Sequence, residues 1–227
     1  MGRKLDHSPN ASLKRQGTST RACVDRLSAV FSTATPSDIE TGAAWYGEAQ
    51  AIASDLAAQG GISIETAAAV IAHLSPRTSW GRNVASAFGL VLDGYAPRCI
   101  GENVKRARRA MRWADPLATL RGPKTAAFSA NILGDRTRVT IDVWAARAAL
   151  GPRILDPETV LRRAGVYGAL EHAYTLAGLR HGVDPVTMQA TVWVVTRRTA
   201  AAWREENDEQ ERLAAEYDRL AKDGATW

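Results

Sequence analysis

The chain has 227 residues, of which 45% are hydrophobic, so it can bury one large helical core or two smaller lobes that share a groove. Its 29 Lys and Arg residues against 24 Asp and Glu residues permit nucleic-acid binding without demonstrating it. Two cysteines exclude a disulfide framework and a four-thiolate metal site, and no apolar run reaches the roughly 18 residues that a membrane span needs. We expect an intracellular, cytoplasmic protein with no membrane partner, because the polar N-terminus is no secretory signal.

Three segments are predicted along the chain. Residues 1–20 are polar and basic, which is typical of a disordered arm. Residues 21–203 are predicted to form one helical domain, and residues 204–227 a charged helix that extends from it. Helices are expected, in chain order, over 21–32, 36–58, 63–74, 83–92, 101–113, 115–120, 123–133 and 141–150, then from 156, over 167–180 and from 184. The fold class is therefore all-α, since the one strand candidate, 138–141, is too short to pair alone.

Positive charge is concentrated in one part of the chain. Residues 98–138 hold ten basic residues and three acidic ones, while the rest of the chain is slightly acidic. A local excess of this kind suits a phosphate-binding surface, in which Lys105 and Arg109 would contact DNA. A solvated helix face is the other interpretation of the same pattern.

A tight turn before a helix follows the basic segment, at Arg121-Gly122-Pro123-Lys124. The first N–H groups of a helix have no partner within the helix, and the helix dipole favours an anion there. Such a turn can hold a DNA backbone without reading its sequence. Many helical hairpins contain a glycine, so this turn alone is a weak signal.

The block from 120 to 151 resembles the helix-hairpin-helix (HhH-GPD) DNA glycosylase superfamily. Gly122-Pro123-Lys124-Thr125-Ala126 matches its GxKTA pattern, and Thr140-Ile141-Asp142-Val143-Trp144 matches its VDxxV segment. Lys124 and Asp142 are 18 residues apart, as in the lysine-bearing members. Leu74-Ser75-Pro76-Arg77-Thr78-Ser79 resembles the LSAQTT-like segment, which faces the DNA at the mouth of the pocket. The resemblance covers roughly residues 63–151, and the chain is also similar to actinobacteriophage proteins with LSPR, GPK, TIDxW and MQAxVW signatures.

The resemblance implies two helical lobes that flank a DNA-binding cleft, with duplex DNA carrying a flipped nucleotide as the partner. Asp142 would be the carboxylate that stabilises positive charge on the sugar or activates a water, and Lys124 the amine that forms a Schiff base. No metal or cofactor is expected, and the compartment would be the bacterial host cytoplasm if a phage encodes the chain. The expected DNA contacts are Arg121, Gly122, Pro123, Thr125, Arg77, Lys105 and Arg109. The expected pocket residues are Ser75, Thr78, Trp80, Asn83, Trp144, Gln189 and Trp193.

Each of these roles has a structural alternative. Asp142 could cap the helix that follows it, and Lys124 could bind a phosphate. Gln189 lies on an apolar helix face and must hydrogen-bond something, either a base edge, an active-site group or a backbone carbonyl. Trp80 and Trp144 could be core residues, and Arg77 a surface ion-pair partner.

The chain also departs from the superfamily pattern. Its hairpin has one glycine where two are usual, Trp144 replaces a smaller or histidine residue, and the four-cysteine iron–sulfur loop of endonuclease III-like members is absent. Three hypotheses therefore stay open: a DNA N-glycosylase with or without lyase activity, a thymine-hypermodification enzyme that displaces pyrophosphate from an activated base in DNA, and a DNA-binding module without catalysis.

Overall fold

The computed structural model describes residues 8–96, 99–152, 154 and 156–199, and every regular element in them is a helix. This confirms the all-α prediction. The helices are α1 Pro9–Lys14, α2 Thr20–Phe31, α3 Pro36–Gly60, α4 Ile64–Leu74, α5 Trp80–Leu92, α6 Gly101–Ala110, the 3₁₀ turn η1 Leu117–Thr119, α7 Pro123–Ile132, α8 Val143–Leu150, α9 Pro157–Leu161, α10 Val166–His181 and α11 Pro185–Thr199. None of these helices is long and apolar enough to cross a membrane.

Local capping chemistry explains where several helices begin and end. The hydroxyl of Thr35 accepts a hydrogen bond from the Asp38 backbone N–H, and the Asp38 carboxylate accepts one in return, which makes a capping box at the start of α3. Gly61 ends α3 in the left-handed region, with φ +61°. Ser63 caps α4 in the same way as Thr35 caps α3.

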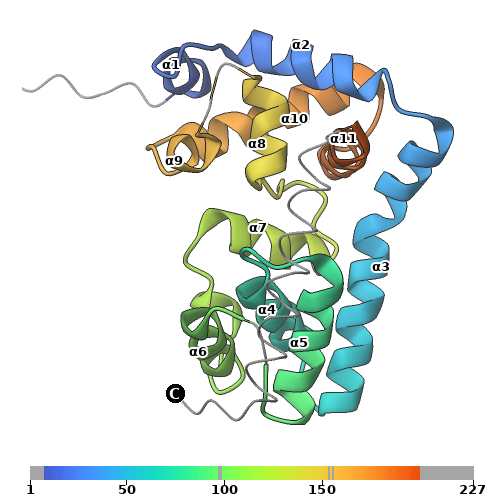
Figure 1. Ribbon diagram of the computed structural model, residues 1–227, viewed down its shortest axis with the longest axis vertical. Coiled ribbons are helices and arrows are strands. Elements are labelled where there is room, and N and C mark those ends of the chain that lie inside the picture. The colour runs from blue at the N-terminus through green and yellow to red at the C-terminus, as the bar shows by residue number, and fades with distance from the viewer. Residues whose placement is uncertain (1–7, 97–98, 153, 155, 200–227) are drawn as a thin grey trace, which may run out of the picture.

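Two hydrophobic clusters divide the molecule into two lobes (Figure 1). The upper lobe packs α1, α2, α8, α9 and α10 around residues such as Leu27, Leu170 and Tyr174. The lower lobe packs α4, α5, α6 and α7 around residues such as Ile71 and Ile132. Helix α3 runs along the side of both lobes, and α11 contributes buried side chains to both clusters.

The contact between α3 and α11 requires a glycine at position 42. A Cβ atom there would lie 2.3 Å from Thr191 Oγ1 and 2.7 Å from the Thr191 backbone nitrogen. The backbone of α11 cannot move away from such a contact cheaply, so Gly42 allows the two helices to approach closely. This contact joins the helix that spans both lobes to the helix that borders the space between them.

Four predictions about local structure need correction. Helix α6 ends at Ala110, three residues before the predicted end at 113. Residues 9–14 form a helix rather than part of a disordered arm, because Leu13 is fully buried against the upper lobe. Residues 117–119 form one 3₁₀ turn rather than a helix over 115–120, since the Asp115 carboxylate accepts from the backbone N–H groups of Leu117 and Ala118 and starts a turn. Helix α5 begins at Trp80, three residues before the predicted start. The predicted helix over 204–227 and residues 1–7 of the arm lie outside the described residues.

His73, on α4, is a buried titratable residue of the lower lobe, with an exposed fraction of 5%. Its Nε2 lies 2.8 Å from Thr119 Oγ1, which ties η1 to α4. Burial, and then the positive charge of Arg106, lower the pKa of His73 from 6.5 to about 4. The imidazole is therefore neutral in the folded protein over a range in which it is charged in the unfolded chain.

We predict that the free energy of unfolding falls as the pH drops from about 6.5 to about 4, because His73 takes up a proton in the unfolded chain but stays neutral in the folded protein. Between pH 6 and pH 5 the loss in free energy of unfolding should be about 1 kcal/mol from this residue. Urea unfolding of the wild type and of His73→Gln measures it. Equal losses in both proteins over that interval would refute the assignment.

Candidate functional site

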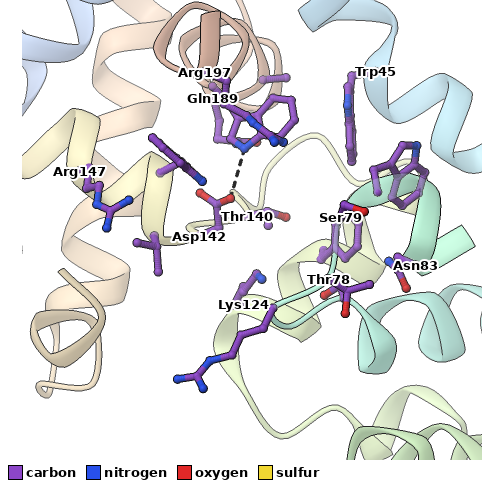
Figure 2. Close-up of a pocket in the computed structure, with 18 of the residues that line it drawn as sticks. Trp45, Thr78, Ser79, Asn83, Lys124, Thr140, Asp142, Arg147, Gln189 and Arg197 are labelled. Atoms are coloured by element: carbon purple, nitrogen blue, oxygen red, sulfur yellow. Dashed lines mark hydrogen bonds between the residues drawn. The ribbon is translucent and has the colours of Figure 1, made fainter. Parts of the chain in front are cut away.

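A pocket of about 770 Å³ lies between the two lobes. Residues from α3, α5, α7, α8, α9 and α11 line it, together with the segments that precede α5 and α8 (Figure 2). All seven predicted pocket residues line it, as do Asp142, Lys124 and Arg77. Tertiary packing thus brings together side chains that are more than 100 residues apart in the sequence.

Asp142 is held rigidly in the wall of this pocket. It is the N-cap of α8, and its Oδ1 accepts a hydrogen bond of 2.7 Å from the Ala145 backbone N–H. Its Oδ2 accepts a second one of 3.2 Å from the indole N–H of Trp193 on α11 (dashed line in Figure 2). Capping, the structural alternative for Asp142, is therefore correct, but a cap and a pocket-facing carboxylate are compatible because the two oxygens have different partners.

The extended segment before Asp142 is anchored on both sides. The Tyr167 hydroxyl accepts from the Ile141 backbone N–H at 2.9 Å and donates to the Val139 carbonyl at 3.0 Å. The Asn131 amide donates to the carbonyls of Asp135 and Arg138, and its oxygen accepts from the Thr140 hydroxyl at 2.7 Å. These bonds replace the strand pairing that residues 138–141 lack, and they fix the position at which Asp142 enters the pocket.

Lys124 reaches the same pocket from the first turn of α7. Its side chain is half-buried and makes no hydrogen bond or ion pair with any described residue. Asp142 lies near the centre of Figure 2, with Lys124 below it on the facing lobe. The amine is therefore available to a ligand that enters between the lobes.

Aromatic rings form a continuous wall on the side of the pocket next to α3. The Trp45 ring centroid lies 5.1 Å from that of Trp80 and 6.0 Å from those of Phe128 and Trp193. Trp80 is therefore part of a pocket-lining cluster and not simply a core residue. Trp144 lines the pocket under the Arg147 guanidinium, at 5.0 Å. Flat apolar walls of this kind suit a flat ring system.

Gln189 is 5% exposed, and its Oε1 accepts a hydrogen bond of 3.0 Å from the Tyr46 hydroxyl. Burial, with a further contribution from the charge of Asp142, raises the pKa of Tyr46 above its usual value, so the hydroxyl remains a donor. The Gln189 Nε2 has no partner among the described residues. The amide oxygen is therefore bonded to a side chain rather than left for a backbone donor, and Gln189 lines the pocket.

Asn83 is 1% exposed and lines the pocket, yet neither atom of its amide has a hydrogen-bond partner (Figure 2). Leaving a buried donor and acceptor unpaired costs about 1–3 kcal/mol each. Asn131 is equally buried but fully paired, whereas Asn83 is a pocket-lining amide without a partner among the described residues. Some buried groups outside the lining, such as Asn103 Nδ2 and Ser129 Oγ, are also unpaired. An orphaned amide in a pocket wall indicates a partner that the pocket receives.

Arg77 is the one described non-glycine residue with a positive φ, at +58°. Its exposed side chain lies 3.6 Å from Glu158 on α9, and both residues line the pocket. This exposed ion pair contributes little to stability. A strained backbone beside a pocket is typical of functional sites, where the surrounding fold enforces it.

The remaining predicted DNA contacts lie outside the pocket lining. Arg121, Gly122, Pro123 and Thr125 form the turn next to Lys124, where Thr125 donates to the Gly122 carbonyl at 3.0 Å. Gly122 caps α7 with φ −88°, so it does not use a glycine-only conformation. Lys105 and Arg109 are exposed on α6.

Ten pocket-lining residues were not among the predicted site residues: Trp45, Tyr46, Ser79, Phe128, Thr140, Val143, Arg147, Glu158, Ala190 and Arg197. The adjacent aromatics Trp45 and Tyr46, in the middle of a helix rich in Ala and Gly, were a signal that could have found two of them. Ser79, Thr140 and Val143 lie inside the two matched motif segments, which could have indicated them. The others depend on how the lobes meet, which no local pattern specifies.

A family model matches residues 10–200, a span that contains both lobes and every pocket residue. The chain belongs to DUF7178, a family of unknown function. No curated protein and no solved structure matches it. Among the described residues of this DUF7178 member, no group of three or more His, Cys, Asp and Glu side chains could hold a metal ion.

We predict that Asn83→Leu stabilises the ligand-free protein by about 1 kcal/mol, because it removes an unpaired buried amide. Asn131→Leu is the matched control, since it removes a paired amide with the same burial and should cost about 2 kcal/mol. Urea denaturation measures both variants. A loss of stability in Asn83→Leu similar to that in Asn131→Leu would mean that Asn83 is a structural residue.

Proposed function

We propose that the protein is a DNA N-glycosylase of the helix-hairpin-helix type, which acts on a nucleotide flipped into the pocket between its lobes. The observation that carries the proposal is the convergence of Asp142 and Lys124 in one aromatic-walled pocket, although they lie 18 residues apart on different lobes. Those two residues are the ones that the resemblance assigns to the chemistry at the sugar.

The carboxylate of Asp142 would stabilise the positive charge that builds on the deoxyribose as the C1′–N bond breaks. Two donated hydrogen bonds, from Ala145 and Trp193, hold this carboxylate in place. Water then adds to C1′, and the base leaves with a proton. Alternatively, the amine of Lys124 attacks C1′ as the C1′–N bond to the base breaks, and the base takes up the amine proton. Opening of the sugar ring at the C1′–O4′ bond then gives a Schiff base, which allows elimination of the 3′ phosphate.

The pocket walls suit an extruded base. Flipping costs a few kcal/mol, which stacking between aromatic rings and hydrogen bonds to the base edge offset. Here Trp45 and Trp80 supply rings, while Gln189 Nε2 and the Asn83 amide supply hydrogen-bonding groups that have no partner among the described residues. The turn at 121–125, exposed at residues 121–123, and Arg77 would contact the phosphates beside the extruded nucleotide.

A second function is favoured by the charge of the pocket lining. Four cations (Arg77, Lys124, Arg147 and Arg197) line it against two acids, Asp142 and Glu158. An excess of cations suits a pyrophosphate leaving group on an activated thymine. In that reaction an amine forms a C–N bond as the C–O bond to pyrophosphate breaks, Asp142 takes a proton from the amine, and the glycosidic bond survives.

Borohydride trapping tests the first proposal, because it reduces a Schiff base to a stable protein–DNA adduct. The duplexes would carry an abasic site, uracil, an oxidised base or 5-hydroxymethyluracil. We expect an adduct with the wild type and with Lys14→Ala, an exposed lysine outside the pocket lining, but none with Lys124→Ala. Asp142→Asn should lose base release by about a thousandfold and keep DNA affinity, because Asn is an equally good N-cap.

Two other results would reject this chemistry. Base release without a trapped adduct would exclude the lyase role of Lys124 and indicate that a water activated by Asp142 attacks the sugar. Intact duplex binding without trapping or base release on any substrate would contradict the glycosylase. Pyrophosphate release from DNA with a pyrophosphorylated hydroxymethyl base would then support the second function, and its absence a binding module.

Trp193 is expected to act as a positioning residue for Asp142. Trp193→Phe keeps an aromatic wall but removes the N–H that donates to Oδ2, so kcat for base release should fall about tenfold while KM stays unchanged. Single-turnover and steady-state kinetics separate the two constants. A rise in KM with unchanged kcat would instead make Trp193 a binding surface alone.

A further inference from the structure

A second charged surface lies on α6, in the lower lobe. Five cations are exposed on this helix and the turn after it: Lys105, Arg106, Arg108, Arg109 and Arg112. The one acidic residue in residues 101–113 is Glu102, which pairs with Arg106 at 3.3 Å. Four cations of this surface therefore have no carboxylate partner among the described residues.

Two exposed aromatic rings lie close to these cations, one in direct contact and one next to a residue that a cation contacts. The Arg109 guanidinium lies 4.5 Å from the centroid of Trp113, which is 52% exposed. Arg108 donates a hydrogen bond of 2.8 Å to the Gly94 carbonyl, next to Tyr95, which is 65% exposed. We call Tyr95, Arg108, Arg109, Arg112 and Trp113 the α6 platform.

The platform is separate from the pocket. None of its five residues lines the pocket, and α6 packs against α4 and η1. In Figure 1, α7 lies between α6 and the upper lobe. A single flipped nucleotide in the pocket would therefore not reach the platform.

We propose that the α6 platform binds single-stranded nucleic acid, with phosphates on its arginines and bases stacked on Trp113 and Tyr95. Proteins that bind single strands combine a cationic surface with exposed aromatic rings, because each unpaired base presents a free face. In a duplex the base faces are stacked and hidden, so the two exposed rings would gain nothing from it. The Arg109 guanidinium lies over the Trp113 ring, so a phosphate-binding cation and a stacking ring are adjacent on this surface.

This binding does not depend on the chemistry proposed for the pocket. A single strand held on α6 would anchor the protein next to unpaired DNA, whether or not the pocket acts on a base. Asp142→Asn should therefore leave single-strand affinity unchanged, which separates a failure of this proposal from a failure of the proposed function.

Fluorescence anisotropy with a labelled oligothymidine of about twelve nucleotides tests the platform on the full chain. Trp113→Ala and Tyr95→Ala should each weaken binding about five- to tenfold, whereas Trp113→Phe should restore most of the loss because it restores a stacking ring. Leu179→Ala is the matched control, since Leu179 is a 72% exposed apolar residue on α10 of the other lobe. Arg112→Gln should lower the slope of log affinity against log salt by about 0.7, while Arg21→Gln, an exposed cation on α2, should not.

Three results would overturn the proposal. Affinity for the oligothymidine that is unchanged in both aromatic variants would remove the stacking role. Equal weakening for a blunt duplex of the same length would make the platform a general polyanion surface. Binding to vesicles with anionic lipid, without binding to the oligothymidine, would assign the exposed rings and arginines to a membrane surface.

Discussion

The close approach of α3 and α11 at Gly42 is the contact on which the pocket depends. Thr191 occupies the space that a side chain at position 42 would need, and its backbone nitrogen lies 2.7 Å from a Cβ built there. From this crossing, α3 carries Trp45 and Tyr46 into the pocket wall, and α11 carries Gln189 and Trp193. The hydrogen bond from Tyr46 to Gln189 is a further contact between α3 and α11, made by residues that line the pocket. A bulkier residue at position 42 would separate the two helices and thereby displace the pocket-lining residues that they carry.

Hydrogen-bonding capacity is divided unevenly across the site. The groups that fix the scaffold are fully paired: Tyr167 holds residues 139–141, Asn131 holds the preceding turn, and Asp142 accepts from both α8 and α11. Within the pocket lining, the Asn83 amide has no partner among the described residues, and neither does Gln189 Nε2. Buried groups outside the lining, such as Asn103 Nδ2 and Thr191 Oγ1, are unpaired as well. A buried amide without a partner weakens the fold, so its presence in a pocket favours a ligand-binding role over a structural one.

In the two proposals, the positive charge of the chain acts at two separate places, the pocket and the α6 platform. Lys124 and the arginines of the pocket lining face a ligand between the lobes, while the α6 platform lies at a distance from it. Lys124 and the arginines of the α6 platform belong to the basic segment, residues 98–138, whereas the pocket arginines come from segments that pack around the same pocket. The proposed activity and the proposed single-strand surface use different residues, and each can be removed without the other.

The sequence by itself determined the helices, because their boundaries depend on neighbouring residues: the Thr35–Asp38 box, Gly61 after α3, and the Asp142 cap of α8. It also brought Asp142, Lys124, Arg77 and all seven predicted pocket residues into one set, through motif spacing and resemblance, while their roles in DNA chemistry stay predictions. Only the tertiary structure decided that Leu13 is buried, that Trp45, Phe128 and Arg147 share the pocket, and that Asn83 is left unpaired. The physical reason is the sequence separation over which each kind of interaction acts. Capping and turn formation act over three or four residues, whereas burial and the pairing of an amide depend on which distant helix packs against it.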